Sequence, residues 1–449
     1  MKTVPTALTI AGSDPSGGAG IQADLKTFSA CGIFGQSVIT AITMQNTLGV
    51  KGTFDIPVET VEQQLGALLE DKKPLAVKTG MLANEAIVDR VARLLKRGKI
   101  RKLVVDPVIR SSSGRALLSK RGVQALKESL LPLATVVTPN IKEAEILSGV
   151  KIVKPADRLK AARALLKTGV KNVLITGGHL RGNPEDFFYD GKHTVKLDTE
   201  RLAGEDLHGT GCVLSAAIIA HLALGKPLAQ AVSDAKDFIG KAILGGVRSG
   251  TGQGSVEPLA LLRQNQERWE LFQRVSHAID ILKEAKIGDL IPEVQSNLGV
   301  GLEDARTHQD VIGFPGRIVK YGQNIVTLSP PRFGGSRHVA NIVLTAMGHD
   351  PSRRAVMNIK YTPELMQICK RLRFKTATFN RADEPGKVRQ KEGSSLEWGT
   401  DHAIRQCGFV PDIIYDIGGM GKEEMIRVIS EDVESLVEKI LKIHRRLSK

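Results

Sequence analysis

The sequence predicts an α/β protein with a mainly parallel sheet flanked by helices, followed by a second, smaller α/β domain. In the first half of the chain, short apolar segments of strand length alternate with amphipathic segments of helical spacing. Such alternation is typical of parallel sheets covered on both faces. A glycine-rich stretch at 245–255 then precedes a region with its own strand and helix patterns, so the 449 residues divide into two domains.

The N-terminal region opens with a strand at 7–11, a glycine-rich loop at 13–20 and a helix at 21–32 that Gly32 ends. Further strands are expected at 37–43, 75–80, 102–108, 135–140 and 172–178, and helices at 58–70, 84–98, 123–132, 142–149, 157–169 and 226–243. The segment 185–197 is expected to form a hairpin that turns at Asp190-Gly191.

The second region follows the stretch 245–255, the most flexible-looking part of the sequence. We place the boundary near residue 258, which defines domains 1–257 and 258–449. A helix is expected from Leu259 to about Lys286, with strands in RRAVMNIKY, KTATFN and DIIYDIGG. The terminal segment 431–449 places its apolar residues on one face and predicts a packing helix, with membrane association as the alternative.

Composition and charge narrow the classes of function. The net charge of +15 suits anionic partners, yet Lys and Arg are interspersed with Asp and Glu, aromatic residues make up 4%, and no nucleic-acid motif is found. We therefore expect phosphorylated metabolites rather than nucleic acid, although a charged surface adapted to heat explains the same composition.

Signals for export or for a membrane are also absent from the sequence. No apolar run could cross a bilayer, and the N-terminal apolar segment is too short for a signal peptide, so we expect a cytoplasmic protein without a membrane partner. Cys31, Cys212, Cys369 and Cys407 lie far apart, which favours neither a disulfide framework nor a zinc site.

The stretch HGTGC, residues 208–212, is the strongest candidate for a functional site. Its glycines precede an apolar helical run and predict a helix N-terminus whose backbone N–H groups, at Gly209, Thr210 and Gly211, hold a transferring phosphoryl group. Cys212 lies in the first turn, where a thiolate is favoured and could take a proton from a substrate hydroxyl. An ordinary glycine-rich helix start with a buried cysteine explains these five residues as well.

Several further segments end predicted strands, and such segments meet at one edge of an α/β sheet. Together they resemble the hydroxymethylpyrimidine kinase and phosphomethylpyrimidine kinase family, ribokinase-like enzymes of thiamine biosynthesis. The resemblance runs in order from residue 4 to about 250 and is specific because so many segments share it. The matching segments are TIAGSDPSGGAGIQADLKTF, SVITAIT with QNT, KTGML, VVDPV, TPNIKEA, GGH and HGTGC.

The resemblance implies two ATP-dependent transfers, which convert hydroxymethylpyrimidine to its phosphate and then to its diphosphate, with Cys212 as the base. It also implies a substrate pocket and a site for Mg²⁺ and the nucleotide phosphates, with Glu143 as the metal ligand. The pocket residues are Gly12, Asp24, Gln45, Met81 and Val108, and the nucleotide and metal residues are Asp106, Asn140 and Glu143. From the residues alone, Gln45 could be a loop-capping surface amide, and Asn140 with Glu143 could be a helix cap.

One position departs from the family pattern. Related kinases lead us to expect Lys before the GGH motif, where Thr176 stands. A hydroxyl cannot neutralise phosphate charge, so another lysine, the metal or the helix N-terminus must take that part. We interpret His208 and His179 as residues that orient loops, and His221 as a packing or surface residue.

The remaining chain, from about 265 to 449, resembles the thiamine-phosphate synthase domain that is often fused to this kinase. The segments that carry this resemblance are FPGRIV, GGSRHVANIVLTAM, RRAVMNIKY, FNRADEP, GSSLEWGT and PDIIYDIGGMGKE. The resemblance implies that a thiazole phosphate captures the pyrimidine-methylene cation left when pyrophosphate departs, which gives thiamine phosphate.

Such a site needs two places for anions, and we expect them at two helix N-termini, after Gly334-Gly335-Ser336 and at Gly418-Gly419 with Gly421-Lys422. Arg317 and His338 are the expected catalytic residues, and Arg337 is expected to bind substrate phosphate, although it could be a surface charge. Asp383, Glu384 and Asp416 are either magnesium ligands or solvated loop carboxylates.

The sequence therefore predicts a bifunctional enzyme that uses ATP and Mg²⁺, binds small-molecule substrates and forms a homo-oligomer. One alternative keeps the kinase and makes the C-terminal domain a sensor of thiamine phosphate. Another is a kinase for a different vitamin, such as pyridoxal.

Overall fold

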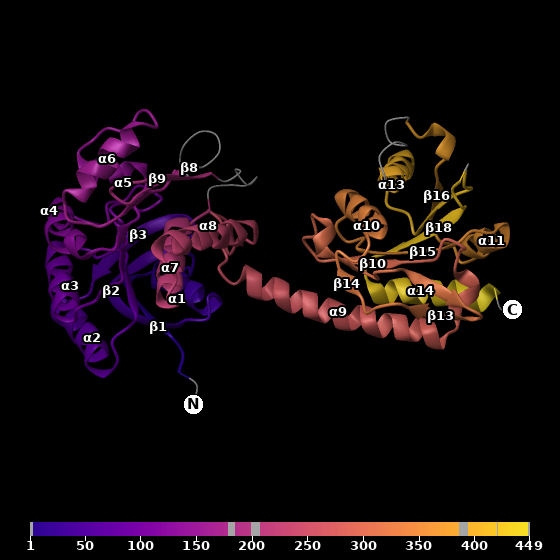
Figure 1. The fold of residues 1–449 in the computed structure, drawn as a ribbon, viewed down its shortest axis with the longest axis horizontal. Helices are drawn as coiled ribbons and strands as arrows, with labels where there is room; N and C mark the ends of the chain where they lie inside the picture. Colours follow the sequence, from indigo (N-terminus) through magenta and orange to yellow (C-terminus); the bar gives the residue numbers. More distant parts are fainter. Residues whose placement is uncertain (1–2, 178–184, 199–206, 386–393, 420, 448–449) are drawn as a thin grey trace. The chain divides into compact units, whose positions relative to one another are not determined.

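The computed structural model describes residues 3–177, 185–198, 207–385, 394–419 and 421–447. The chain divides into two compact units, residues 1–263 and 264–449, each with its own sheet (Figure 1). The division falls within one long helix, α9 (Ala260–Glu284), a few residues after the boundary that the sequence suggests.

The first unit contains a nine-stranded sheet in the order β3-β2-β1-β4-β5-β6-β7-β8-β9. The strands from β2 to β7 in this order are parallel, whereas β3 at one edge and β8 and β9 at the other are antiparallel to their neighbours. The strands are β1 (Thr6–Ser13), β2 (Phe34–Asn46), β3 (Gly49–Asp55), β4 (Ala76–Thr79), β5 (Leu103–Val105), β6 (Val136–Val137), β7 (Val173–Ile175), β8 (Glu185–Tyr189) and β9 (Thr194–Asp198).

Helices cover both faces of this sheet, because alternate strand residues point to opposite sides. On β1, Leu8 and Ile10 join the core under α2 to α6, whereas Ala7 joins the core under α1, α7 and α8. The helices are α1 (Gly20–Ala30), α2 (Val58–Asp71), α3 (Glu85–Arg97), α4 (Lys120–Ala125), α5 (Ile141–Ser148), α6 (Asp157–Leu166), α7 (Thr210–Ala223) and α8 (Leu228–Leu244). The predicted strands and helices of this region are confirmed, as is the hairpin at Asp190-Gly191.

Two features of the first unit differ from expectation. The antiparallel strand β3 was missed, because GVKGTFD has two glycines and weak alternation. The stretch 245–255 is not a free linker but packs on the first unit, where Ser255 pairs with Val247 and His208. Glycine allows this contact, since a Cβ on Gly252 would lie 2.1 Å from the carbonyl oxygen of Thr47.

The second unit is built on a seven-stranded sheet in the order β14-β11-β10-β15-β18-β17-β16, beside the hairpin β12-β13. Within this sheet β16 and β17 run parallel, and the other neighbouring pairs are antiparallel. The strands are β10 (Leu298–Gly301), β11 (Val311–Gly313), β12 (Ile318–Tyr321), β13 (Asn324–Thr327), β14 (Arg332–Phe333), β15 (Ala355–Lys360), β16 (Thr376–Thr378), β17 (Ile413–Asp416) and β18 (Met425–Ser430).

Helices again cover both faces of the second sheet. The helices α10 (Arg337–His349) and α13 (Ser394–Cys407) pack on one face, and α9, α11 (Pro363–Arg371) and α14 (Val433–Leu447) pack on the other (Figure 1). In α14 the predicted apolar face is confirmed, because Val433, Leu436 and Ile440 are fully buried. Among the described residues, no helix is long and apolar enough to cross a membrane.

Candidate functional site

A cavity of about 370 Å³ lies at the carboxyl ends of the parallel strands in the first unit. Its wall comes from the loops after β1, β4, β5 and β6, from the end of β2, and from α7 and α8. It brings together most of the residues that the sequence singled out, which are Gly12, Gln45, Met81, Asp106, Val108, Asn140, Glu143, Gly209, Thr210, Gly211 and Cys212. Asp24 is the exception: its carboxylate is fully buried and does not line the cavity.

The predicted helix N-terminus at HGTGC is confirmed. Helix α7 begins at Thr210, and Gly209 caps it with φ +88°. A Cβ at Gly209 would lie 1.9 Å from the carbonyl oxygen of Gly18, so this position requires glycine. The first-turn N–H groups have no carbonyl partner inside the helix and belong to residues that line the cavity, an arrangement that is typical of anion sites.

Cys212 lies in this first turn, but its surroundings oppose the thiolate that the sequence predicts. Burial raises the pKa of the Cys212 thiol to about 12, and the nearby carboxylates of Asp106 and Asp24 raise it further, although Lys78 opposes them. The backbone N–H of Gly20, at the start of α1, also faces the sulfur and lowers the pKa. Part of Cys212 faces the cavity, so a bound ligand can change the thiol's surroundings.

Sequence reasoning missed Lys78, which is fully buried at the end of β4. Its Nζ lies 2.8 Å from both carboxylate oxygens of Asp24 and 3.9 Å from Asp106 Oδ2. Burial alone lowers the pKa of a lysine, but here the carboxylates outweigh it and raise the pKa, so Lys78 stays charged. A lysine inside an apolar strand was the available signal, because such a residue needs a buried carboxylate partner.

The helix-cap interpretation of Asn140 and Glu143 is confirmed, and both residues also line the cavity. The Asn140 side chain accepts from the Glu143 N–H, and Glu143 Oε2 accepts from the Asn140 N–H. Burial and the neighbouring Asp106 raise the pKa of Glu143 to about 8. Asp106 accepts a hydrogen bond of 3.0 Å from Ser215 Oγ, which ties it to α7.

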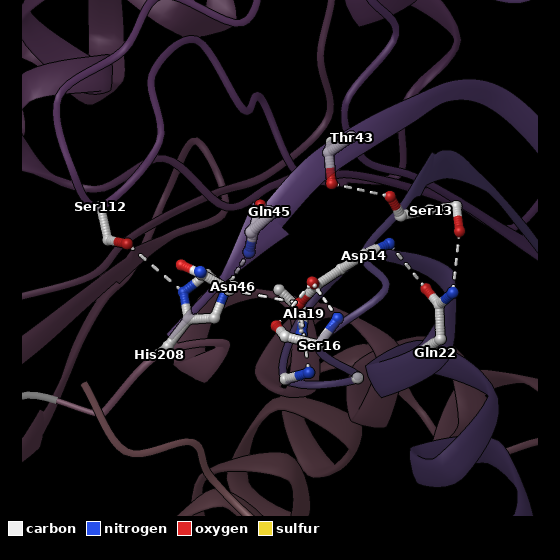
Figure 2. A network of polar contacts seen from close by, with 12 residues as sticks. Ser13, Asp14, Ser16, Ala19, Gln22, Thr43, Gln45, Asn46, Ser112 and His208 are labelled. Carbon is white, nitrogen blue, oxygen red and sulfur yellow. Dashed lines mark hydrogen bonds and ion pairs between the residues drawn. The ribbon is translucent and has the colours of Figure 1, made fainter. Parts of the chain in front are cut away.

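A polar network surrounds His208 at the cavity wall (Figure 2). Asp14 holds the loop after β1 by accepting from Ser16 and from the N–H groups of Gly18 and Ala19. Burial alone would raise the pKa of Asp14, but the neighbouring His208 ring and the hydrogen bonds from Ser16 and Ala19 lower the pKa to about 2. Gln45 points toward His208 and is not a surface amide.

Thr176 also lines the cavity, and the structure places a lysine nearby. Lys236 of α8 reaches the cavity wall, with its Nζ 2.5 Å from Asp186 Oδ2. The other oxygen of Asp186 accepts from the N–H of Gly177, the residue after Thr176. His179 lies outside the described residues, and His221 is a half-buried packing residue in the last turn of α7.

In the second unit, one of the two predicted anion sites is a helix N-terminus. Helix α10 begins at Arg337 directly after Gly334-Gly335-Ser336, and a Cβ on Gly335 would lie 2.5 Å from the carbonyl oxygen of Gly313. Arg337 and His338 are exposed in the first turn. Arg317 is also exposed, and its guanidinium donates to the carbonyl of Val294.

The other predicted helix N-terminus is wrong. The glycines after β17 form a turn in which Gly419 pairs with Lys422, and the chain continues into β18 rather than into a helix. A glycine pair after a strand fits a strand-to-strand turn as well as a helix start, and the β-branched residues of β18 decide between them.

Of the three acidic residues near this turn, Asp383 is exposed, as a solvated loop carboxylate would be, whereas the other two are buried in ion pairs. Asp416 is fully buried between Arg381 and Arg427, at 2.6 and 2.8 Å. Glu384 is also buried and accepts from Lys422 Nζ at 3.2 Å. The part of the chain that the structure describes contains no cluster of three or more His, Cys, Asp or Glu side chains able to hold a metal.

Comparison with known proteins agrees with these two units. The sequence matches the phosphomethylpyrimidine kinase family over residues 14–257 and the thiamine-phosphate synthase ThiN family over residues 274–442. The bifunctional thiamine biosynthesis protein ThiDN of Methanocaldococcus jannaschii is 33% identical over 434 residues, which cover 96% of this chain and 97% of that protein. The hydroxymethylpyrimidine/phosphomethylpyrimidine kinase of Haemophilus influenzae is 46% identical over 269 residues, covering 59% of this chain and 100% of the relative.

Solved structures resemble the first unit. The pyridoxal kinase of Staphylococcus aureus in complex with ADP has a TM-score of 0.55 at 37% identity, covering 58% of this chain and 96% of its own. The same kinase in complex with AMP-PCP and pyridoxal gives a TM-score of 0.54 over the same shares of the two chains.

The fold and the cavity define the first unit as a ribokinase-like kinase of small molecules, joined to a second α/β unit. The chain belongs to the family of bifunctional thiamine biosynthesis proteins in which phosphomethylpyrimidine kinase is followed by thiamine-phosphate synthase. It is a bifunctional enzyme that has both the kinase and the synthase domain.

Proposed function

We propose that the first unit phosphorylates 4-amino-5-hydroxymethyl-2-methylpyrimidine, and then its phosphate, with ATP. The observation that carries this proposal is the cavity itself, where the N-terminus of α7, Cys212 and the amide of Gln45 meet in one space. The relatives' names support the substrate, and the ADP and AMP-PCP complexes of the pyridoxal kinase support the nucleotide.

Each side chain has a role that follows from its position. Gln45 pairs with the amino-pyrimidine edge, Met81 and Val108 cover the ring, and Gly12 lets it approach closely, since a Cβ there would lie 3.1 Å from Met81 Sδ. Cys212 acts as the thiolate: its own proton must first leave to solvent, and the sulfur then takes the proton of the attacking hydroxyl. The N–H groups of Gly209, Thr210 and Gly211 stabilise the charge on the transferring phosphoryl group. Asp24 takes a positioning role through Lys78.

The donor set of the cavity fits Mg²⁺ held partly by water and phosphate. Asp106 and Glu143 both line the wall, and the raised pKa of Glu143 shows that the pair bears two negative charges only at a cost. A divalent cation would offset that cost, with Glu143 as its ligand, directly or through water, and Asp106 beside it. When bound, the ion would neutralise charge on the nucleotide phosphates. We further propose that Lys236 supplies the positive charge missing at Thr176.

For the second unit we propose that the pyrimidine diphosphate is coupled to thiazole phosphate, giving thiamine phosphate and pyrophosphate. The N-terminus of α10 offers an anion site, His338 in its first turn can donate to the leaving group, and Arg317 and Arg337 can contact phosphate oxygens. The match to the synthase family favours this reaction over a sensor of thiamine phosphate.

We also propose a cytoplasmic homo-oligomer, in keeping with a reaction that uses ATP. Support for the oligomer comes from exposed apolar side chains on the edge of the first sheet. Ile42 pairs with Phe54 across β2 and β3, and Met44 lies two residues along on the same face; they are 46%, 58% and 49% exposed. A second copy of this chain would cover them, and Ile42→Lys is then expected to lower the mass measured by light scattering.

The proposal is tested with the purified full-length protein, the aminopyrimidine, ATP, magnesium and thiazole phosphate, with products identified by mass. Thiamine phosphate and pyrophosphate are expected, and omission of the thiazole should leave the pyrimidine diphosphate. A protein that makes the diphosphate but never thiamine phosphate would support the sensor. Faster turnover of pyridoxal than of the aminopyrimidine would support the other vitamin kinase.

A further inference from the structure

His208 is the side chain of the HGTGC motif that the proposed reaction leaves unused, and its ring lies between three polar groups. Its Nε2 is 2.8 Å from Gln45 Nε2 and 3.6 Å from Asp14 Oδ2, and its Nδ1 is 3.3 Å from Ser112 Oγ (Figure 2). The side chain is only 20% exposed. The ring therefore borders the same cavity that Gln45 lines.

The backbone holds this ring in place. The His208 N–H donates to the carbonyl of Gly254 and its carbonyl accepts from the N–H of Val256. On the other side the ring packs on Gly18, where a Cβ would lie 3.2 Å from His208 Cδ2. The stretch 245–255 thus holds the backbone of His208 in place, and the His208 ring can in turn orient Gln45.

The contact with Gln45 decides the tautomer of the ring. An amide nitrogen only donates, so Nε2 of His208 must accept and the ring proton must lie on Nδ1, toward Ser112. The carboxylate of Asp14 favours a proton on Nε2, but it lies 3.6 Å away, beyond hydrogen-bond distance, and its two oxygens already accept four hydrogen bonds from Ser16, Gly18 and Ala19. The shorter contact of 2.8 Å with the Gln45 amide therefore prevails.

We propose that His208 is a specificity-determining positioning residue, which holds the Gln45 amide with nitrogen toward the ring and so sets which substrate edge it can pair with. The inference rests on the proposed role of Gln45. In this orientation Oε1 accepts from the 4-amino group while the second Nε2 hydrogen donates to ring N3, as a glutamine amide pairs with an adenine edge. A 4-oxo pyrimidine presents the reverse pattern, an N3–H donor beside an oxygen acceptor, and is disfavoured.

The test compares the aminopyrimidine with 5-hydroxymethyl-2-methylpyrimidin-4-one, using the full chain and ATP. Wild type should prefer the amino compound. His208→Leu removes the acceptor, so the Gln45 amide can rotate and exchange its oxygen and nitrogen. KM for the amino compound should then rise about tenfold, while kcat stays within about threefold of the wild-type value. The preference for the amino over the oxo compound should fall by about tenfold. A loss of the same size for both compounds, with the preference unchanged, would mean that His208 only holds the loop and would overturn the proposal.

Two further variants separate the possible failures. In a Gln45→Ala background, His208→Leu should leave the preference unchanged, because the residue acts through Gln45. If the single variant Gln45→Ala keeps the preference for the amino compound, the proposed role of Gln45 is wrong. If Gln45→Ala loses that preference but the single variant His208→Leu keeps it, the proposed role of His208 is wrong. The matched control is His193→Leu in the β8-β9 turn, whose side chain is 78% exposed and pairs with Asp190 away from the cavity.

A measurement on the wild-type protein covers the case that His208→Leu does not fold. In protein labelled with ¹⁵N-histidine, the His208 signals, assigned by their change in Ser112→Ala, should report a proton on Nδ1 and none on Nε2. A ring protonated on Nε2 would require the opposite amide orientation and would overturn the proposal.

Discussion

Each unit buries a small group of charged side chains beside its sheet, and the two groups have opposite compositions. In the first unit the cation Lys78 lies among two carboxylates, Asp24 and Asp106. In the second unit the carboxylate Asp416 lies between two arginines, Arg381 and Arg427. The first group borders a cavity and has one more carboxylate than cations, which favours binding of a further cation. The second group has one more cation than carboxylates.

The comparison shows that a buried charged residue can position its neighbouring side chains even where it does not contact a ligand. Lys78 holds Asp24 and lies near Asp106, and only Asp106 and Lys78 reach the cavity wall. Arg427 and Arg381 both lie over the ring of Phe379, at 5.2 and 5.6 Å, so the second group is packed as part of the core. Substitutions in the site of each unit, and in its group of buried charged residues, test this difference between the two units.

The largest effect is expected for Cys212→Ala. The loss of the base should lower kcat of the kinase by about 10²–10⁴-fold, with pyrimidine binding retained, measured by steady-state kinetics and calorimetry. Synthase activity on added pyrimidine diphosphate should be unchanged. The matched control is Cys407→Ala in the second unit, which should keep full kinase turnover; wild-type turnover in Cys212→Ala would remove Cys212 from its role.

The next effect is on stability, and it should differ between the two clusters. Lys78→Met leaves carboxylates buried without their cation and should destabilise the first unit by about 3–5 kcal/mol. Arg427→Met leaves Asp416 paired with Arg381, so a smaller loss of about 1–3 kcal/mol is expected in the second unit.

Urea unfolding separates these two variants, because both tryptophans, Trp269 and Trp398, belong to the second unit. Fluorescence follows that unit alone, while circular dichroism follows both. Equal losses for the two variants would show that the surplus charge of each cluster has no bearing on its stability.

The synthase residues should show a smaller effect, confined to one activity. Arg317→Ala and His338→Ala should each lower thiamine phosphate formation by about 10–100-fold and let the pyrimidine diphosphate accumulate, as losses of charged hydrogen bonds do. Arg337→Ala, one residue from His338, should cost less. Product analysis by mass checks this, and an equal fall in kinase activity would show that the variants disturb more than the second unit.

A prediction that requires no substitution concerns the pH dependence of the Cys212 thiol. Because only the thiolate is alkylated, and burial raises the pKa of Cys212 to about 12, its reaction with iodoacetamide should rise about tenfold per pH unit from pH 7 to 10 without levelling off. Peptide mass mapping gives the rate at each pH. A plateau near pH 8 or 9 would show that the helix N-terminus outweighs burial, as the sequence alone suggested.

Much of the first unit could be predicted because its signals are local. The strands are short apolar runs, the Asn140 cap and its Glu143 partner are three residues apart, and Gly209 sits where the helix must start. The same locality explains the errors. The turn at Gly418 and a helix start share one local pattern, and the stretch 245–255 looked mobile because its partners, Thr47 and His208, are distant in sequence.

The sequence by itself determined most strands and helices of the first unit, the start of α7 and the apolar face of α14, since these depend on residues within a turn or two of one another. Only the tertiary structure decided which charges are buried together and what His208 touches. Lys78 and Asp24 are 54 residues apart, and Gln45 and His208 are 163 apart. The free energy of such a contact depends on the surrounding low dielectric and on how the partner's lone pairs are oriented, and both are set only once the chain has folded.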